Sequence, residues 1–427
     1  IQKFLKDKKL EIKTISCSNI LKKNCNAINA HHTNIEKNKF KSEMICKRCI
    51  SNDKFLRKKL DIPNYNLNDW INYRDKEKTK TILKKINKKN IINYCYKNIP
   101  VGKIAMFEII LEFKKNNLNL NNFEYYKLKN NLENCINTIW AFEKMSKNFQ
   151  PDYVITYNGS YAINSLFLKF FKEKKAIPYL ITGSTNNNER LSNVHLFRES
   201  YFDTIFEIKK NWIKLKKYSF NKSEALSVIN HMKTLFFSST SHTFSPSIKG
   251  NYVDVRNYFK IKKNQKIILV SMSSYDEVLS AYLLYTKKSL GGIFKDQIEW
   301  IENVIKNFKN KNEYFIIFRP HPREFLKTND SIYLRKLKKI FSMLPSNMCV
   351  NYPKDKISIH NLGMETSLLL NAWSSAGEDL GMLGIPTISI SKNFMNYPSN
   401  IDYYEDNKKK YFIKVYKILS KDNWSVK

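Results

Sequence analysis

A run of five apolar residues that stops before a proline limits most strongly how this chain can fold. Tyr314–Phe318 (YFIIF) has no polar alternation, which is typical of a strand buried on both faces of a parallel sheet. Pro320 and Pro322 have no N–H to donate, so the strand has to end before them. The motif Arg319–Arg323 (RPHPR) therefore follows the carboxyl end of a buried strand, where open α/β sheets bind ligands. Two guanidinium groups around an imidazole suit an anion such as a phosphate or diphosphate.

Strand-like and helix-like segments alternate in two stretches of the chain, which indicates βαβ units and parallel sheets. A segment rich in Ser, Thr and Pro, 238–250, lies between the stretches and reads as a linker. We therefore expect an α/β protein of two Rossmann-like domains, 1–240 and 251–427, that face each other across a cleft. The expected strands are 153–157, 177–182, 202–208, 266–270, 314–318, 348–352, 366–371 and 386–390, and the expected helices between and after them include 161–174, 295–308, 376–383 and one from 408.

The first domain is expected to carry a Lys-rich helical insert over 53–150. Its clearest part is 123–147, where apolar residues recur every three or four positions, as in an amphipathic helix. A strand is expected at 11–17. The chain opens at Ile1 inside an expected helix, 1–10, so its start reads as truncated.

The chain is strongly basic, with 74 Lys and Arg against 38 Asp and Glu and a formal net charge of +36. The lysines are scattered and alternate with asparagine, which favours a general surface bias over one binding block. Contact with an anionic membrane surface is the next interpretation. A nucleic-acid partner is not expected, because no common nucleic-acid-binding signature is present. With no run of about 18 apolar residues, we expect no transmembrane helix. The irregular cysteines and the lack of a secretory signal lead us to expect a cytoplasmic protein, free or at the inner face of the cytoplasmic membrane.

The seven cysteines are unevenly spaced and odd in number, which favours reduced thiols. Cys46 and Cys49 form a CxxC pair that a zinc site could use, but the chain has no second pair. Buried thiols are the preferred interpretation, and no metal is expected.

Three turns of the second domain follow strands and could bind the anion together. The first is rich in serine, the second is the RPHPR motif, and the third begins a helix, whose N-terminal amides and dipole favour negative charge. Each turn alone is more often an ordinary helix cap, so the prediction depends on all three meeting at one sheet edge. The candidate donor-binding residues are Ser271, Ser273, Ser274, Arg319, Arg323, Ser374, Ser375 and Gly377.

Three residues of these turns are candidates for the chemistry. Asp276 could accept a proton from an acceptor, although it could equally cap a helix. His321 should have a lowered pKa through repulsion by its flanking arginines, and a neutral imidazole could donate to a phosphate; it could also only fix the turn. Glu378 could accept from ribose or sugar hydroxyls, although an acid in a first helical turn is favoured by the dipole alone. In the first domain, the turn Asn158, Gly159 and Ser160 is the candidate acceptor contact, or an ordinary turn.

Four segments together resemble the GT-B glycosyltransferases of bacterial capsule and surface-polysaccharide biosynthesis. Residues 150–159 are similar to that family's PD–strand–NG element, and 319–322 to its R-x-H-P element. Residues 352–362 are similar to the segment before its donor pocket, and 373–388 to its S-x-x-G-x-E…G-x-P-x-I motif. Together the four segments span the second two-thirds of the chain.

The resemblance implies a nucleotide-sugar donor in the second domain, where His321, Ser375 and Glu378 would contact nucleotide, diphosphate or sugar and Ser358 would line the donor pocket. It implies no metal or other cofactor, and a saccharide or lipid-linked acceptor. Two alternatives stay open, because fold does not fix function. One is a sugar-nucleotide epimerase or a polyol-phosphate transferase on the same architecture. The other is a non-catalytic basic protein that binds nucleic acid or anionic lipid.

Overall fold

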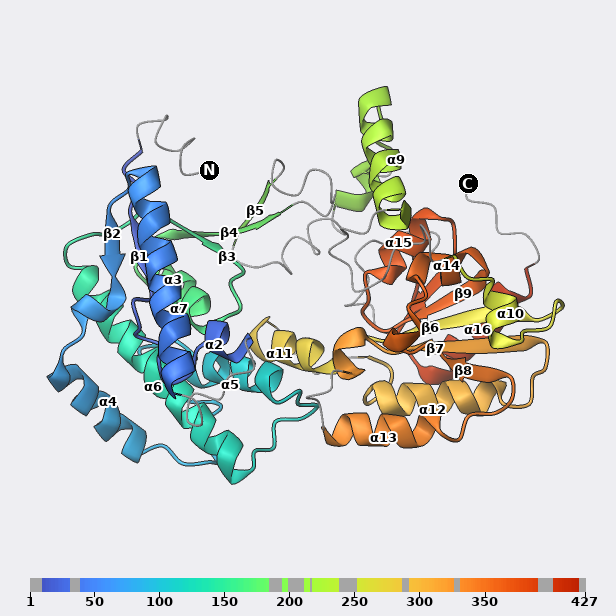
Figure 1. The fold of residues 1–427 in the computed structure, drawn as a ribbon, viewed down its shortest axis with the longest axis horizontal. Helices are drawn as coiled ribbons and strands as arrows, with labels where there is room; N and C mark the ends of the chain where they lie inside the picture. The colour runs from blue at the N-terminus through green and yellow to red at the C-terminus, as the bar shows by residue number, and fades with distance from the viewer. Residues whose placement is uncertain are drawn as a thin grey trace.

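The protein consists of two α/β units side by side in the computed structural model (Figure 1). The structure describes residues 10–30, 39–183, 194–198, 211–215, 217–237, 252–285, 292–325, 331–390 and 402–421. The expected α/β class with two Rossmann-like units is confirmed. The expected linker 238–250, the expected strand 202–208 and most of the expected helix 1–10 lie outside the described residues.

The second unit is built on a six-stranded parallel sheet in the order β11-β10-β9-β6-β7-β8. The apolar run predicted as a strand is β7, which lies between β6 and β8 with its residues 315–318 buried. Five of the six strands were predicted, and only the two-residue β11 was not. Their bounds are β6 Lys266–Ser271, β7 Tyr314–Arg319, β8 Met348–Val350, β9 Thr366–Asn371, β10 Thr387–Ser389 and β11 Asp402–Tyr403.

Helices cover both faces of this sheet. Along β6, Ile268 and Val270 share a core with residues of α12, α13 and α16, whereas Ile267 and Leu269 share a core with α10, α14 and α15. Because successive strand residues point to opposite faces, both sets can be apolar, which explains the uninterrupted apolar run of β7. The helices are α10 Val255–Phe259, α11 Tyr275–Tyr285, α12 Gln297–Phe308, α13 Ile332–Phe341, α14 Ile359–Met364, α15 Ala376–Met382 and α16 Lys408–Leu419, with 3-10 turns η2 Pro322–Phe325 and η3 Pro353–Asp355.

The first unit is mostly helical, as the predicted insert requires. The predicted amphipathic helix is α6, whose start is fixed by a capping box: Asn121 accepts from the Glu124 amide, and Glu124 accepts from the Asn121 amide. The bounds are β1 Thr14–Ser16, α2 Asn26–Ala30, α3 Lys39–Leu60, β2 Asn64–Asn66, η1 Leu67–Trp70, α4 Tyr73–Lys84, α5 Val101–Glu112, α6 Asn122–Met145, β3 Tyr153–Tyr157, α7 Ala162–Glu173, β4 Ile177–Gly183 and β5 Val194–Arg198. The helix α9, Lys222–Phe237, comes next in the chain and packs on the second unit through its last turn.

The strands of the first unit differ from the sequence-based expectation in two places. β3 and β4 pair in parallel as predicted, but β5 runs antiparallel to β4, so the expectation of a purely parallel sheet is wrong here. β1 pairs with β2 in a separate two-stranded sheet, and β2 was not predicted. With three residues, β2 is too short for a periodic signal.

The two units are joined by α5 and α11, which pack against each other (Figure 1). Buried apolar residues of both units form one continuous cluster through this contact. Since α11 begins just after the carboxyl end of β6, that edge of the large sheet faces the first unit. None of the described helices has the length and apolar character needed to cross a membrane.

Gly102, near the start of α5, has no room for a side chain. A Cβ there would lie 2.0 Å from the Ile91 carbonyl oxygen and 2.6 Å from that of Ile92. We expect Gly102→Ala to lower the free energy of unfolding by about 1–3 kcal/mol, because the backbone has to shift. Urea unfolding measures this, with Gly292→Ala as the control, since a Cβ there would meet nothing closer than 3.4 Å. Equal effects of both substitutions would contradict the prediction.

Candidate functional site

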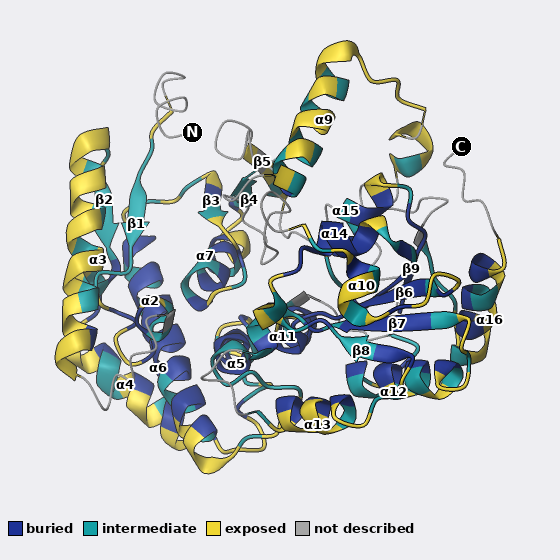
Figure 2. Ribbon diagram, turned by 45° about the vertical axis from the view of Figure 1, so that its right-hand side comes forward, coloured by how far each residue is buried: buried dark blue, intermediate teal, exposed yellow. Residues whose placement is uncertain are grey.

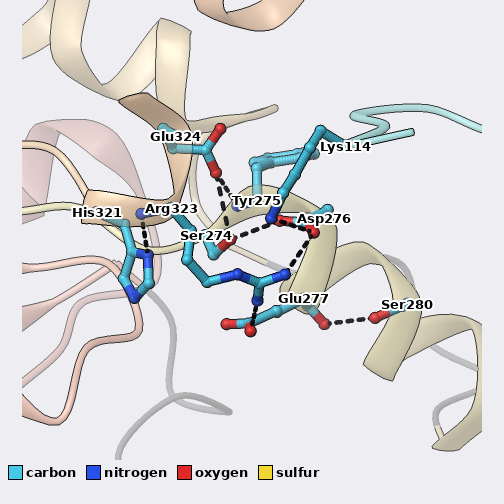
Figure 3. Close-up of polar contacts among 9 residues, drawn as sticks. All are labelled: Lys114, Ser274, Tyr275, Asp276, Glu277, Ser280, His321, Arg323 and Glu324. Atoms are coloured by element: carbon cyan, nitrogen blue, oxygen red, sulfur yellow. Dashed lines mark hydrogen bonds and ion pairs between the residues drawn. The ribbon is translucent and has the colours of Figure 1, made fainter. Parts of the chain in front are cut away.

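Charged side chains from both units meet at the carboxyl ends of β6 and β7 (Figure 3). The two strands pair in parallel, with Ser271 opposite Arg319, so their ends reach the same edge. After β6 the chain enters α11, which carries Asp276. After β7 it passes His321 and enters η2. The sequence predicts that three turns meet at this edge. The turns after β6 and β7 contact each other through Glu324, and the turn after β9 lies at the same edge because β9 pairs in parallel with β6.

A serine hydroxyl connects two buried carboxyl groups in this site. Ser274 Oγ lies 2.5 Å from Asp276 Oδ1 and 3.3 Å from Glu324 Oε1, and the Tyr275 amide donates to the same Glu324 oxygen at 3.3 Å. Burial, and secondly the negative charge of Asp276, raise the pKa of Glu324 to about 7. A serine hydroxyl has one proton to donate, and the short contact assigns it to Asp276.

Two cations pair with Asp276. Lys114, just beyond α5 in the first unit, places Nζ 3.0 Å from Asp276 Oδ2, and Arg323 places Nη2 3.4 Å from the same oxygen. Arg323 also pairs with Glu277 on the outer side (Figure 3). Burial is the main cause that lowers the pKa of Lys114. Asp276 is thus buried with both oxygens engaged, and it connects the two units electrostatically.

His321 is neutral at pH 7 and is held in one tautomer. Its Nδ1 accepts from the Arg323 amide at 3.3 Å, so the ring proton belongs on Nε2. The pKa of His321 is lowered to about 4, mainly by burial and next by Lys114. The pKa of His321 is lowered, as the sequence predicted, but the predicted cause was repulsion by the flanking arginines. In the structure burial and Lys114 lower this pKa most, and Arg319 contributes least.

Arg319 stabilises the sheet edge through hydrogen bonds. Its Nη1 donates to the Ile357 carbonyl oxygen at 3.0 Å and also to Asn351, just after β8. Burial lowers the pKa of this guanidinium to about 10. Arg319 therefore ties β7 to the segment that leads into α14.

The serines after β6 are buried. Ser271, Ser273 and Ser274 are each almost fully covered. Ser273 exchanges two hydrogen bonds of 2.9 Å with Gln297 through its backbone, while its Oγ is buried with no hydrogen-bond partner in the described part of the chain. It lines a small pocket of about 30 Å³ together with Gln297 and Trp373. Ser273 is therefore the serine of this turn best placed to receive a ligand atom.

The turn before α15 is shaped by Asn371 at the end of β9. Asn371 donates to the Ser374 carbonyl oxygen and accepts from the Ser374 amide, both at 3.1 Å, and Ser374 Oγ accepts from the Ala376 amide at 3.2 Å. A Cβ on Gly377 would lie 2.5 Å from Asn371 Nδ2, so the glycine serves this side-chain contact. Ser375 is exposed, and Glu378 is half-buried in the first turn of α15.

Ser358 lies fully buried at the start of α14. Its Oγ accepts from the His360 amide at 3.2 Å, which makes it the cap of that helix. The structure thus gives Ser358 a structural role and no exposed surface.

The candidate acceptor turn follows β3 and is tightly built. Asn158 is exposed, has a φ of 52°, and accepts from the Ser160 amide at 3.1 Å. Asn164 holds the turn by donating to the Asn158 carbonyl oxygen at 2.9 Å. A Cβ on Gly159 would lie 2.7 Å from side-chain atoms of Leu168 and Leu180. The left-handed backbone explains the asparagine, and the packing explains the glycine.

The sequence analysis missed two residues of this cluster. Glu324 ends the same YFIIFRPHPRE segment, and an acid three residues after the histidine was a signal that could have pointed to it. Lys114 gave no signal, because it precedes Asp276 by 162 positions and belongs to the other unit.

The CxxC pair lies on one helix. Cys46 and Cys49 are both in α3; Cys46 is half-buried and Cys49 is exposed, so the expectation of buried thiols is wrong for Cys49. Among the residues the structure describes, no group of three or more His, Cys, Asp or Glu side chains is arranged to hold a metal ion.

No family model and no curated protein matches this chain. Among solved structures, the β-Kdo 2,4-transferase KpsC of Thermosulfurimonas dismutans is similar over 61% of this chain and 74% of its own, with 12% identity and a TM-score of 0.38. UDP-GlcNAc 2-epimerase of Methanocaldococcus jannaschii is similar over 69% and 76%, with 15% identity and a TM-score of 0.34. The S. aureus MnaA–UDP complex is similar over 75% of this chain and 86% of its own, with 10% identity and a TM-score of 0.35. At these TM-scores the likenesses carry no argument, so a function has to be argued from the site.

Proposed function

We propose that this chain is a GT-B-type glycosyltransferase that moves a sugar from a nucleotide-sugar donor to a surface-polysaccharide or lipid-linked acceptor. The observation that supports it is the neutral, tautomer-fixed His321 beside Arg323 and Lys114 at the carboxyl edge of a parallel sheet. Such an edge is where α/β folds bind nucleotides. Cations and an N–H donor there can offset the charge that develops on a departing nucleotide phosphate.

His321 and Arg323 are the proposed contacts to the diphosphate. Both are partly exposed, and His321 Nε2–H points to a donor role, since a pKa of about 4 makes the ring a weak base at pH 7. Ser273 Oγ and the exposed Ser375 are the proposed further donor contacts, and Glu378 the proposed sugar contact. Arg319 would act indirectly, by fixing the end of β7.

Asp276 is better suited to a positioning role than to the role of base expected from sequence. Its two oxygens already hold Ser274, Lys114 and Arg323. By holding two cations at the sheet edge, it would pre-orient positive charge for the phosphate. These cations would also remove the need for a metal ion, and we propose that activity persists in a chelator.

The donor is found by a thermal-shift screen of UDP-, GDP-, CMP- and CDP-sugars, since a ligand of the native state raises Tm. With the donor identified, His321→Ala should lower kcat by about 10²–10³-fold, because one donor to the developing negative charge is lost. His321→Gln, which keeps an N–H, should lose less. The pH–rate profile of the wild-type enzyme should show no change between pH 5 and 8 that comes from titration of His321.

Product analysis separates the candidate activities. Transfer only in the presence of an acceptor supports the glycosyltransferase. Conversion of the sugar nucleotide without an acceptor would establish the epimerase alternative instead. No Tm shift with any nucleotide sugar, or unchanged turnover of His321→Ala, would contradict this assignment of the site.

A further inference from the structure

We propose that α9 and the residues just before it form a docking surface for an anionic membrane. We call residues 211–215 and 217–237 the α9 arm. The first part of the arm, 211–215 and 217–222, reads NWIKL and KYSFNK in sequence, with three lysines, five large apolar side chains and no acid. Glu224 is the single acidic residue in the sequence of the arm. Interleaved lysines and large apolar residues are typical of segments that lie in a membrane interface.

Several large apolar side chains of the arm are exposed to solvent. Ile213 is 68% exposed and Phe220 67% exposed, and Leu215 and Tyr218 between them are exposed as well. Farther along, Leu226 and Ile229 of α9 are also exposed. Most of the arm is therefore uncovered, in contrast to the buried helices of the large sheet (Figure 2). Exposed apolar patches of this kind mark surfaces that bind a partner or a membrane.

The helix α9 is anchored at its last turn and projects at its start. Leu235 is buried, and the ring of Phe236 lies 4.9 Å from that of His360 in α14, so the last turn of α9 packs on the second unit. The beginning of α9 extends away from the body of the protein (Figure 1). A projecting, basic, apolar segment can enter the headgroup region while the fold stays intact.

Charge and side-chain type together favour a lipid surface over other partners. Each lysine near an anionic leaflet contributes about 1 kcal/mol of attraction, and Lys214, Lys217 and Lys222 are all exposed. Ile213 and Leu215 are aliphatic and gain from contact with acyl chains, whereas an electrostatic contact with nucleic-acid phosphates would leave them in water. A second copy of this chain would bring the lysines of two arms together and repel. This inference does not depend on the proposed catalytic activity.

Flotation of the full chain with vesicles tests the proposal. We expect binding to phosphatidylcholine vesicles that contain phosphatidylglycerol, weakened by salt, and little binding to phosphatidylcholine alone. Ile213→Ser with Phe220→Ser should weaken binding by at least about tenfold, since two apolar side chains that would enter the membrane interface are lost. Lys214→Glu with Lys217→Glu should weaken it similarly. The matched control is Ile332→Ser with Ile413→Ser, exposed by 62% and 55% in the second unit, and it should bind like wild type.

Folding is checked by circular dichroism and Tm, and every substituted residue is exposed. The helix α3 is the competing surface, since Phe40 and Phe55 are exposed on it among basic residues. Loss of vesicle binding in Phe40→Ser with Phe55→Ser, but not in the arm variants, would overturn the proposal. Equal binding to neutral vesicles would overturn it as well. Binding to RNA without binding to vesicles would also overturn it. Self-association in sedimentation that depends on the arm, again without vesicle binding, would do the same.

Discussion

Replacing Asp276 with alanine is expected to lower the free energy of unfolding by about 3–5 kcal/mol. Lys114 Nζ and Arg323 Nη2 lie 3.0 and 3.4 Å from the same carboxylate oxygen, and the Asp276 side chain is 1% exposed. Without the carboxylate, the largely buried Lys114 would remain charged without its counter-ion between the two units. Denaturant unfolding, monitored by circular dichroism, measures the loss.

The neighbouring residue provides the control. Glu277 also pairs with Arg323, but its side chain is 48% exposed, so Glu277→Ala should cost less than about 1 kcal/mol. Adding Lys114→Met to Asp276→Ala should restore part of the stability, because the uncompensated charge is then removed. If Asp276→Ala and Glu277→Ala had equal effects, the buried cluster would not be the electrostatic link that we describe.

Replacing Glu324 with glutamine is expected to make the protein more stable at pH 8 while changing little at pH 4. The usual pKa of 4.5 is raised to about 7 in the fold, so the folded chain holds this proton more tightly. The stabilisation is complete below about pH 4.5 and is lost as the pH rises through about 7. The difference between the two pKa values corresponds to roughly 3 kcal/mol. The substituted amide would keep an oxygen to accept from the Tyr275 amide, and would carry no charge to desolvate.

Unfolding of wild type and Glu324→Gln from pH 4 to 8 measures this prediction. The pKa of Glu108 is also raised to about 7, so its contribution to stability likewise falls as the pH rises. The pKa of His321 is lowered to about 4, so its contribution to stability rises between about pH 4 and 6.5. Both groups are present in both proteins, so the difference between the two curves isolates Glu324. Parallel curves would show that Glu324 titrates normally.

The same variant tests whether Glu324 takes part in the chemistry. If Glu324 only changes the local charge, donor binding by the wild type should become tighter as Glu324 is protonated. Glu324→Gln should then keep its turnover and lose this pH dependence of donor binding. A loss of about 10²–10⁴-fold in kcat would instead identify Glu324 as a general base or acid.

The second unit was largely predictable from sequence, and the reason is its buried parallel sheet. Strands such as β7 and β9 are apolar on both faces, and Pro320 follows the end of β7, so their bounds are readable within a residue or two. β2 was missed because it has three residues and pairs with β1, which is far away in the sequence. β5 is held to β4 as an antiparallel strand, which local sequence does not specify.

For the candidate site, the sequence predicted that the turns after β6 and β7 share one sheet edge, but it could not assign the roles of single residues. The motif around His321 was found because an imidazole between prolines is unusual after a strand. The burial of Ser358, the bracing contacts of Arg319 and the pairing of Asp276 with Lys114 depend on tertiary contacts. Local pattern carries no information on which side chains of a polar turn remain accessible.

The packing of α11 on α5 has a consequence for how the molecule behaves on denaturation. The apolar cluster runs through both units without a break, and α11 contributes Tyr275, Val278, Leu279 and Tyr282 to it. Each half produced alone would expose that surface to water and tend to aggregate. The two sheets should therefore melt together in one cooperative transition, and the protein should resist dissection into separately folding halves.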